Sequence, residues 1–316
     1  MITDDEVEQV FQSLGAQIKN LEVRGGAFAA HGNIGCLLML ASVMAVIAFA
    51  GMMPEEGAAS SWMSTWWSVP ASFFSALACF VVGGSLWRRW AKHNDELMLE
   101  TDATLTRPLV ELLVPGASFS RPRIIVSGWH PSLLIAEEDG ASGIELGQID
   151  GCLLGQTAVI AELESPVSWI VRVELPFGIA GHLRIRSMAH LGPGRFWSAG
   201  FEKHSVASKR LGAGYSIDSA PQGTGLDKSV VTPPKLVPIE ALFSNALFDQ
   251  LRAHPDINVA VVGCALWIVL PRAIRAFQGR VASQSELRAW KQAAKAMRDV
   301  QGVVREVLAA GEGATL

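Results

Sequence analysis

Charged residues are scarce in this chain of 316 residues, because they make up only 18% of it, against about 25% in ordinary soluble proteins. The net charge is −4 at pH 7, so no general attraction to nucleic acid is expected. Hydrophobic residues make up 50% of the chain, and the mean hydropathy is +0.29. Low charge combined with high hydropathy predicts a membrane segment.

The usual signatures of catalysis and of metal binding are missing as well. There is no Gly-x-Ser-x-Gly elbow and no His-Glu-x-x-His pair. None of the seven histidines has another His, Cys or carboxylate at a metal-ligand spacing. The Gly-, Ser- and Pro-rich residues 212–234 do not fit a phosphate-binding motif, so we expect a loop there and leave open whether it binds a ligand. We therefore identify no catalytic residue, no metal and no cofactor.

Cysteine is rare too, with four residues in the chain. Cys36, Cys79, Cys152 and Cys264 lie in apolar runs and form no Cys-x-x-Cys motif. We expect each of them to be a small buried hydrophobic residue, which suits a reducing compartment.

Charge is absent altogether from two long runs, at residues 34–53 and 68–87. About 20 apolar residues are enough for a helix to span a bilayer, and the connector between the runs is short. The sequence therefore predicts an antiparallel transmembrane hairpin within residues 33–90. A secretory signal peptide fits poorly, because the segment before the first run is long and acidic.

Tryptophan and basic residues flank these runs. The connector carries Glu55 and Glu56 but no Lys or Arg, so the positive-inside rule places both termini and the main domain in the cytoplasm, at a bacterial inner membrane. Aromatic residues gather at membrane interfaces. The predicted interface residues are Trp62, Trp66, Trp67, Trp87, Arg88, Arg89, Trp90 and Lys92.

Two further patterns predict contacts between helices. Small residues four positions apart let another helix approach closely, and they are Ala71, Ser75, Cys79 and Gly83. They would pack on the first predicted span or on another subunit. Apolar residues at alternating spacings of four and three form a coiled-coil seam, and they are Val7, Phe11, Leu14, Ile18 and Leu21. The seam is too short to be stable alone, so it needs residues 94–116 or a partner chain.

The residue pattern changes after residue 119. Short runs rich in Val, Ile and Leu alternate with Gly, Pro and Ser, and a helical pattern over residues 237–255 interrupts them. "HLRIRS" (His182 to Ser187) alternates as a half-exposed strand should. Strands followed by a helix and two more strands favour α+β with a mainly antiparallel sheet.

The predicted fold is thus a membrane-anchored α+β protein. It has an N-terminal amphipathic helix (1–32), the transmembrane hairpin (33–90), and a connecting helix and linker (91–119). A cytoplasmic, mainly antiparallel β domain with one or two packed helices (120–282) and a C-terminal amphipathic helix and tail (283–316) follow. The last helix has a basic side, and we leave open whether it lies on anionic lipid or packs on its own domain.

Several stretches resemble a bacterial family of uncharacterised two-span membrane proteins. The matching text is "RPLVELLVPGASFSRP", "GWHPSLLI", "IDGCLLGQTAVIAELES" and "VPIEALFSNALFDQLRAHPDINVAVVGCALWIVLPR". The resemblance implies an N-terminal helix, a two-span hairpin and a cytoplasmic α+β domain. Genes of this family often lie near those of LemA-type membrane proteins, which implies a membrane-associated partner. The resemblance implies no reaction, and it assigns no functional residue to this chain.

Two functional hypotheses follow. The first is an inner-membrane-anchored scaffold or accessory subunit that acts through protein–protein contacts, with membrane lipid and a protein partner or a second copy as its partners and no nucleic acid. The second is a membrane-tethered enzyme or ligand sensor, with a pocket near Glu202 and His204, which form a polar cluster with Lys203.

Overall fold

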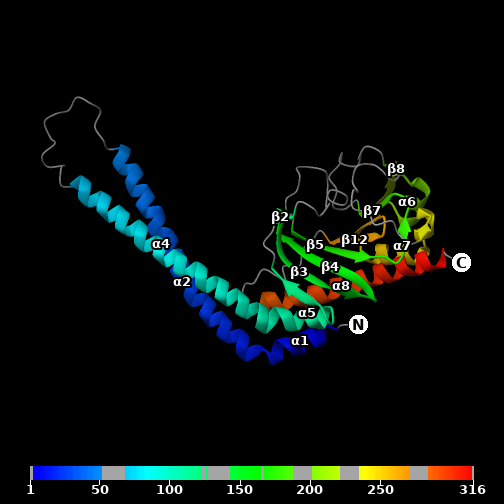
Figure 1. Ribbon diagram of the computed structural model, residues 1–316, viewed down its shortest axis with the longest axis horizontal. Coiled ribbons are helices and arrows are strands. Elements are labelled where there is room, and N and C mark those ends of the chain that lie inside the picture. The colour runs from blue at the N-terminus through cyan, green and yellow to red at the C-terminus, as the bar shows by residue number, and fades with distance from the viewer. Residues whose placement is uncertain are drawn as a thin grey trace. The chain divides into compact units, whose positions relative to one another are not determined.

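The computed structural model describes residues 3–51, 68–121, 125–126, 143–164, 167–187, 201–220, 235–270 and 284–314 (Figure 1). The chain divides into two compact units. One comprises Met1–Ser13, Leu105–Gly279 and Gln284–Leu316, and we call it the α/β unit. The other comprises Leu14–Thr104 and Arg280–Ser283, and we call it the hairpin unit.

The hairpin unit is built from two long helices, α2 (Gly15–Gly51) and α4 (Ser68–Thr101), which lie side by side and antiparallel (Figure 1). A π-helical turn, η1 (Asp102–Thr106), continues α4. The seam between the helices repeats every seven residues, as in a coiled coil. Its buried or half-buried members are Leu21, Gly35 and Ser42 on α2, and Ala76, Gly83, Trp90 and Leu97 on α4.

Glycine allows the closest approach of the two helices. A Cβ atom at Gly83 would lie 2.8 Å from the carbonyl oxygen of Gly35, and one at Gly35 would lie 3.0 Å from that of Gly83. One turn further along, a Cβ atom at Gly32 would lie 2.8 Å from the ring of Trp90. Further toward the start of α2, the Arg24 guanidinium pairs with the Glu100 carboxylate of α4 at 2.7 Å. The backbones thus touch at one crossing point, and side chains hold them together on one side of it.

The predicted transmembrane hairpin is wrong for the part of the chain that the structure describes. No helix there combines the length and the apolar character needed to cross a membrane. The prediction relied on uncharged runs, but α2 also includes charged residues from Lys19 to Arg24, and α4 includes those from Arg88 to Glu100. Residues 52–67, which hold the end of the first run and the connector, lie outside the described residues. The described fold is α+β with a large antiparallel sheet.

That sheet forms the α/β unit, and its strand order is β1-β3-β4-β5-β12-β11-β7-β9-β8, with β2 beside β3. Its pairings are antiparallel. The strands are β1 (Ser118–Ser120), β2 (Ile125–Val126), β3 (Gly143–Leu153), β4 (Gln156–Glu164), β5 (Val167–Glu174), β7 (His182–Ser187), β8 (Glu202–Lys203), β9 (Tyr215–Ala220), β11 (Asn258–Val262) and β12 (Ala265–Leu270). A separate parallel pair joins β6 (Gly178–Ile179) to β10 (Leu236–Val237).

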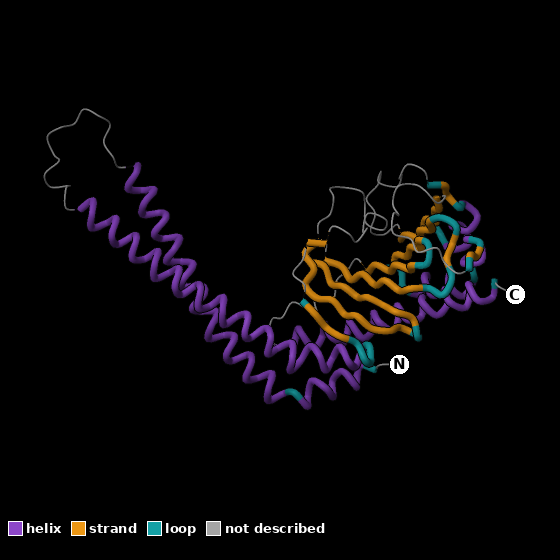
Figure 2. The backbone as a smooth tube through the Cα atoms, in the orientation of Figure 1, coloured by secondary structure: helices purple, strands orange, loops and turns teal. Residues whose placement is uncertain are grey.

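The described helices of this unit pack on the sheet or on one another. They are α1 (Asp4–Ser13), α5 (Arg107–Leu113), α6 (Ser205–Leu211), α7 (Asn245–Ala253) and α8 (Gln284–Gly313). Figure 2 shows α8 running along the sheet. Its apolar stripe, which includes Trp290, Met297 and Val304, is buried. A helix with one apolar face is stable when that face is packed against a sheet, so the apolar side of the C-terminal helix belongs to the core of this unit. On its basic side, Arg288, Lys295 and Arg305 are exposed.

The structure differs from the sequence pattern in three places. The helix expected over residues 237–255 is two elements, a 3₁₀ turn η4 (Ile239–Leu242) and α7, because Ser244 accepts a hydrogen bond from the Leu247 amide and begins a new helix. Part of the expected loop 212–234 is strand β9, while residues 221–234 lie outside the described residues. Cys36 and Cys152 are exposed and Cys79 and Cys264 half-buried, so the expectation of four buried thiols is wrong.

Candidate functional site

The hairpin unit exposes an unusual amount of apolar surface. Many large apolar side chains between Ile34 and Trp87 are between 45% and 66% exposed. On α2 they are Ile34, Leu37, Leu40, Val43, Met44, Val46 and Ile47. On α4 they are Phe73, Phe74, Leu77, Phe80, Val81, Val82 and Trp87. Contiguous exposed apolar surface of this kind marks an interaction site rather than an ordinary protein surface.

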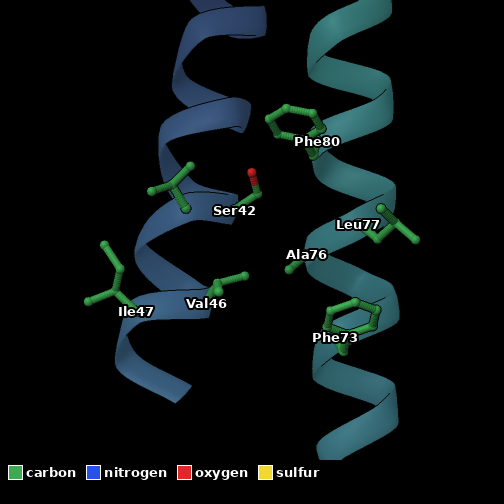
Figure 3. Close-up of a pocket in the computed structure, with 8 residues that line it drawn as sticks. Ser42, Val46, Ile47, Phe73, Ala76, Leu77 and Phe80 are labelled. Carbon is green, nitrogen blue, oxygen red and sulfur yellow. The ribbon is translucent and has the colours of Figure 1, made fainter. Parts of the chain in front are cut away.

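An apolar groove runs between the two helices on this surface, with a volume of about 240 Å³ (Figure 3). From α2 it is lined by Ser42, Val43, Val46 and Ile47, and from α4 by Phe73, Ala76, Leu77 and Phe80. Figure 3 shows Ser42, Val46 and Ala76 directed toward the facing helix. The Ser42 hydroxyl donates to the Met39 carbonyl oxygen at 2.7 Å, so the one polar side chain of the lining already has an acceptor in its own helix.

The residues predicted for a membrane interface are only partly described. Trp87, Arg88, Arg89 and Lys92 are exposed and Trp90 is half-buried, and the rings of Trp87 and Trp90 lie 6.4 Å apart. Trp62, Trp66 and Trp67 lie outside the described residues. Trp90 also packs on the backbone of α2 at Gly32, so this tryptophan has a role within the hairpin itself.

The predicted stripe of small residues does not lie as one line against α2. Gly83 is buried at the crossing with Gly35, Cys79 is half-buried, and Ser75 is exposed. The side chain of Ala71 lies outside the described residues. The contact line on α4 instead repeats every seven residues and includes Ala76. This follows from the near-parallel crossing of two long helices, which favours a repeat of seven over one of four.

The predicted N-terminal seam is divided between the two units. The chain turns at Leu14, so α1 and α2 are separate helices. Val7 and Phe11 are buried in the α/β unit, where α1 packs on α8 and α5. Ile18 and Leu21 are buried in the hairpin unit. Residues 94–116 thus supply one contact of α1 through α5, and α8 supplies the other.

Ion pairs join α1 to the basic side of α8. The Lys291 ammonium donates to Glu8 Oε2 at 2.6 Å, and the Arg298 guanidinium donates to Asp4 Oδ1 at 3.0 Å. The hydrogen bond and positive charge of Lys291 lower the pKa of Glu8, and the Glu8 carboxylate raises the pKa of Lys291. These two cations of α8 therefore interact with acidic residues of the same unit.

A row of basic residues on β7, which we call the basic row, is buried. His182, Arg184 and Arg186 are 3%, 2% and 4% exposed. Arg186 pairs with Asp218 of β9 at 2.6 Å, and the Ser216 hydroxyl donates to the same carboxylate at 3.0 Å.

The guanidinium of Arg184 lies 3.4 Å from the ring centre of Phe201. Because the apolar residues of β7 are buried too, this strand is covered on both faces and not half-exposed as its alternation predicts.

The acid–base cluster considered from the sequence does not converge. Glu202 and Lys203 are exposed, and as neighbours on β8 they point to opposite faces of the sheet. His204 Nε2 lies 2.7 Å from the Ser219 hydroxyl, and its ring packs edge-on against Phe243. Within the described ranges, no three His, Cys, Asp or Glu side chains are placed to hold a metal. The enzyme or sensor hypothesis stays a prediction.

Comparisons with known proteins add little. No protein-family model matches the chain, and no curated protein matches it, so the resemblance to the two-span family stays a prediction. A match among solved structures is the crystal structure of the mycobacterial trehalose monomycolate transport factor A, TtfA. It is 12% identical over 53% of this chain and 76% of that chain, with a TM-score of 0.30. A likeness this low carries no argument about function.

Proposed function

We propose that this protein is a scaffold or accessory subunit, and that the hairpin unit is the part through which it contacts other protein. The observation that carries the proposal is the exposed apolar surface of α2 and α4, with the groove between them. Fully burying an exposed leucine or phenylalanine side chain supplies about 1.5–3 kcal/mol, and these side chains, which are about half exposed, forgo roughly half of that. A partner that covers the surface recovers part of this free energy.

The helices themselves support a role in contact rather than in chemistry. Residues 32–47 and 73–87 contain no Asp, Glu, Lys, Arg or His, so the thiols of Cys36 and Cys79 are the only titratable side chains of these two stretches. The backbone crossing at Gly35 and Gly83 fixes the two helices relative to each other. A fixed groove is a better docking surface than a mobile one, because less conformational entropy is lost on binding.

Site-specific photo-crosslinking tests the proposal. A benzophenone amino acid placed at Leu77, in the groove, should give protein adducts in cells that express the full chain. The matched control is the same probe at Val206, which is also exposed but lies on α6 of the α/β unit. Protein adducts at Leu77 and not at Val206 are the expected result. Adducts with phospholipid alone at Leu77 would show that a bilayer, and not protein, covers the surface.

A further inference from the structure

We infer that the occupant of the apolar groove on the hairpin unit is the hairpin unit of a second copy of this chain. The inference rests on the proposed function and deepens it, because it names the partner.

The groove is small for a site that holds a whole cofactor. Its volume of about 240 Å³ lies below the roughly 300–1,000 Å³ of small-molecule sites. Its floor is formed by the small residues Ser42 and Ala76, which are 4% and 8% exposed, and its border by Phe73 and Phe80, which are 58% and 50% exposed. A hollow of this shape accepts single protruding side chains, as the holes of a helix–helix interface do.

The surface around the groove restricts the chemistry of the occupant. It carries no charge over residues 32–47 and 73–87. A partner with charged side chains over this length would lose their hydration without gaining an ion pair, which is costly. The occupant must therefore be uncharged and apolar over a similar length. A second hairpin unit meets this requirement because it has the same surface.

The hairpin unit has exposed apolar area that a dimer interface can bury. Four aromatic side chains, Phe73, Phe74, Phe80 and Trp87, are between 45% and 65% exposed. At about 150–250 Å² for each aromatic side chain, they alone expose about 400 Å². Ten aliphatic side chains of the uncharged stretches 32–47 and 73–87 are exposed to a similar extent. The part of this area on the side that carries the groove counts toward the roughly 800 Å² per partner of a standard interface.

Two-fold symmetry makes the hollows and the protrusions complementary. In a C₂ dimer the same patch is used by both copies, so each groove faces the protruding side chains of the other copy. Phe80 lines the groove and is half exposed, and Figure 3 shows its ring between the two helices. Each substitution in this patch is therefore present at two places in the interface, once from each copy.

Self-association of the purified full chain tests the inference. Analytical ultracentrifugation should show a dimer for the wild type. The double variant Leu77→Ser with Phe80→Ser should raise the dimer dissociation constant at least about tenfold, because central interface residues dominate binding. Leu99→Ser is the matched control: Leu99 is 71% exposed on the same helix, beyond the uncharged stretch, and its replacement should leave the dimer unchanged. Circular dichroism verifies that both variants remain helical.

A monomeric wild type across the micromolar range overturns the inference, as does a dimer that the double variant does not weaken. Photo-crosslinking at Leu77 with two differently tagged copies separates the remaining cases. A cross-link between the two tags supports the second copy. A cross-link to a different protein overturns this inference and leaves the proposed function standing. Adducts with phospholipid alone overturn both.

Discussion

The two units of the molecule use apolar and polar residues in opposite ways. The α/β unit buries even its charges, since Arg184, Arg186 and Asp218 are nearly inaccessible to solvent. The hairpin unit leaves many large apolar side chains exposed, such as Leu37 and Phe74, and buries only a narrow seam, which includes the small residues Gly83 and Ala76 beside larger ones elsewhere. A glycine seam brings the helices close but buries little apolar area. The stability of the α/β unit is therefore internal, whereas the hairpin unit has surface left for a partner.

The largest effect should come from the buried ion pair of the α/β unit. Asp218→Asn leaves the buried guanidinium of Arg186 facing a neutral amide. Breaking a buried pair in this way costs about 3–5 kcal/mol. Chemical denaturation of the full chain, followed by the tryptophan signal, should show this loss.

The double substitution Arg186→Met with Asp218→Leu provides the control. Replacing a buried pair by apolar residues of similar volume is often neutral, so it should recover most of the stability. If the double variant is as unstable as Asp218→Asn, the loss comes from packing rather than from the uncompensated charge.

In the hairpin unit, Gly83→Leu should break the helix crossing. The new Cβ atom would lie 2.8 Å from the Gly35 carbonyl oxygen, and a backbone atom cannot rotate away, so α2 and α4 must separate. Overpacking of this kind costs about 1–3 kcal/mol. Hydrogen exchange should accelerate in α2 and α4 and stay unchanged in β4, β5 and β12.

Gly84→Leu is the matched control for the crossing. A Cβ atom at Gly84 meets nothing within 4 Å, and leucine is a better helix former than glycine by nearly 1 kcal/mol. In this variant, hydrogen exchange in α2 and α4 should be unchanged or slightly slower than in the wild type. Equal acceleration of exchange in both variants would mean that the crossing does not hold the helices together.

Sequence reasoning recovers the α/β unit better than the hairpin unit, and the reason is physical. Alternating apolar residues report strands such as β4 and β5 because a sheet with a covered face requires them. The same reasoning fails at β7. Its alternating charged residues predict a face exposed to solvent, but these residues are buried. Their burial depends on partners far away in sequence, such as Asp218, and the spacing in "HLRIRS" does not encode those partners.

For the hairpin unit, hydropathy correctly finds two long helices but assigns them the wrong environment. The two helices also extend past the uncharged runs into charged turns that the predicted spans leave out. Gly35 and Gly83 could be recognised from the sequence as candidates for a close helix crossing, because they are small residues within apolar runs. That these two glycines face each other could not be predicted. Both runs contain several small residues, and the structure is needed to show which of them meet.

A smaller effect is expected at the start of α7 in the α/β unit. The Ser244 hydroxyl accepts a hydrogen bond from the Leu247 amide at 3.1 Å. Ser244→Ala removes this cap and should cost about 1 kcal/mol, seen as a lower denaturation midpoint. Ser244→Thr retains an oxygen at the same place and should recover most of the loss. No difference between the two variants would show that the cap does not stabilise α7.

The smallest effect concerns α1, whose docking on α8 uses ion pairs at the surface. Because Lys291 lowers the pKa of Glu8, docking stabilises the ionised carboxylate. That stabilisation is present above the ordinary Glu value of 4.5 and is lost as the pH falls through the lowered pKa of Glu8. An NMR titration of Glu8 should give a pKa below 4.5 in the wild type and a value close to 4.5 in Lys291→Met. Glu8→Gln should remove this part of the pH dependence of amide protection in α1. An unchanged Glu8 titration in Lys291→Met would show that the ion pair does not form in solution, and that burial of Val7 and Phe11 alone holds α1 in place.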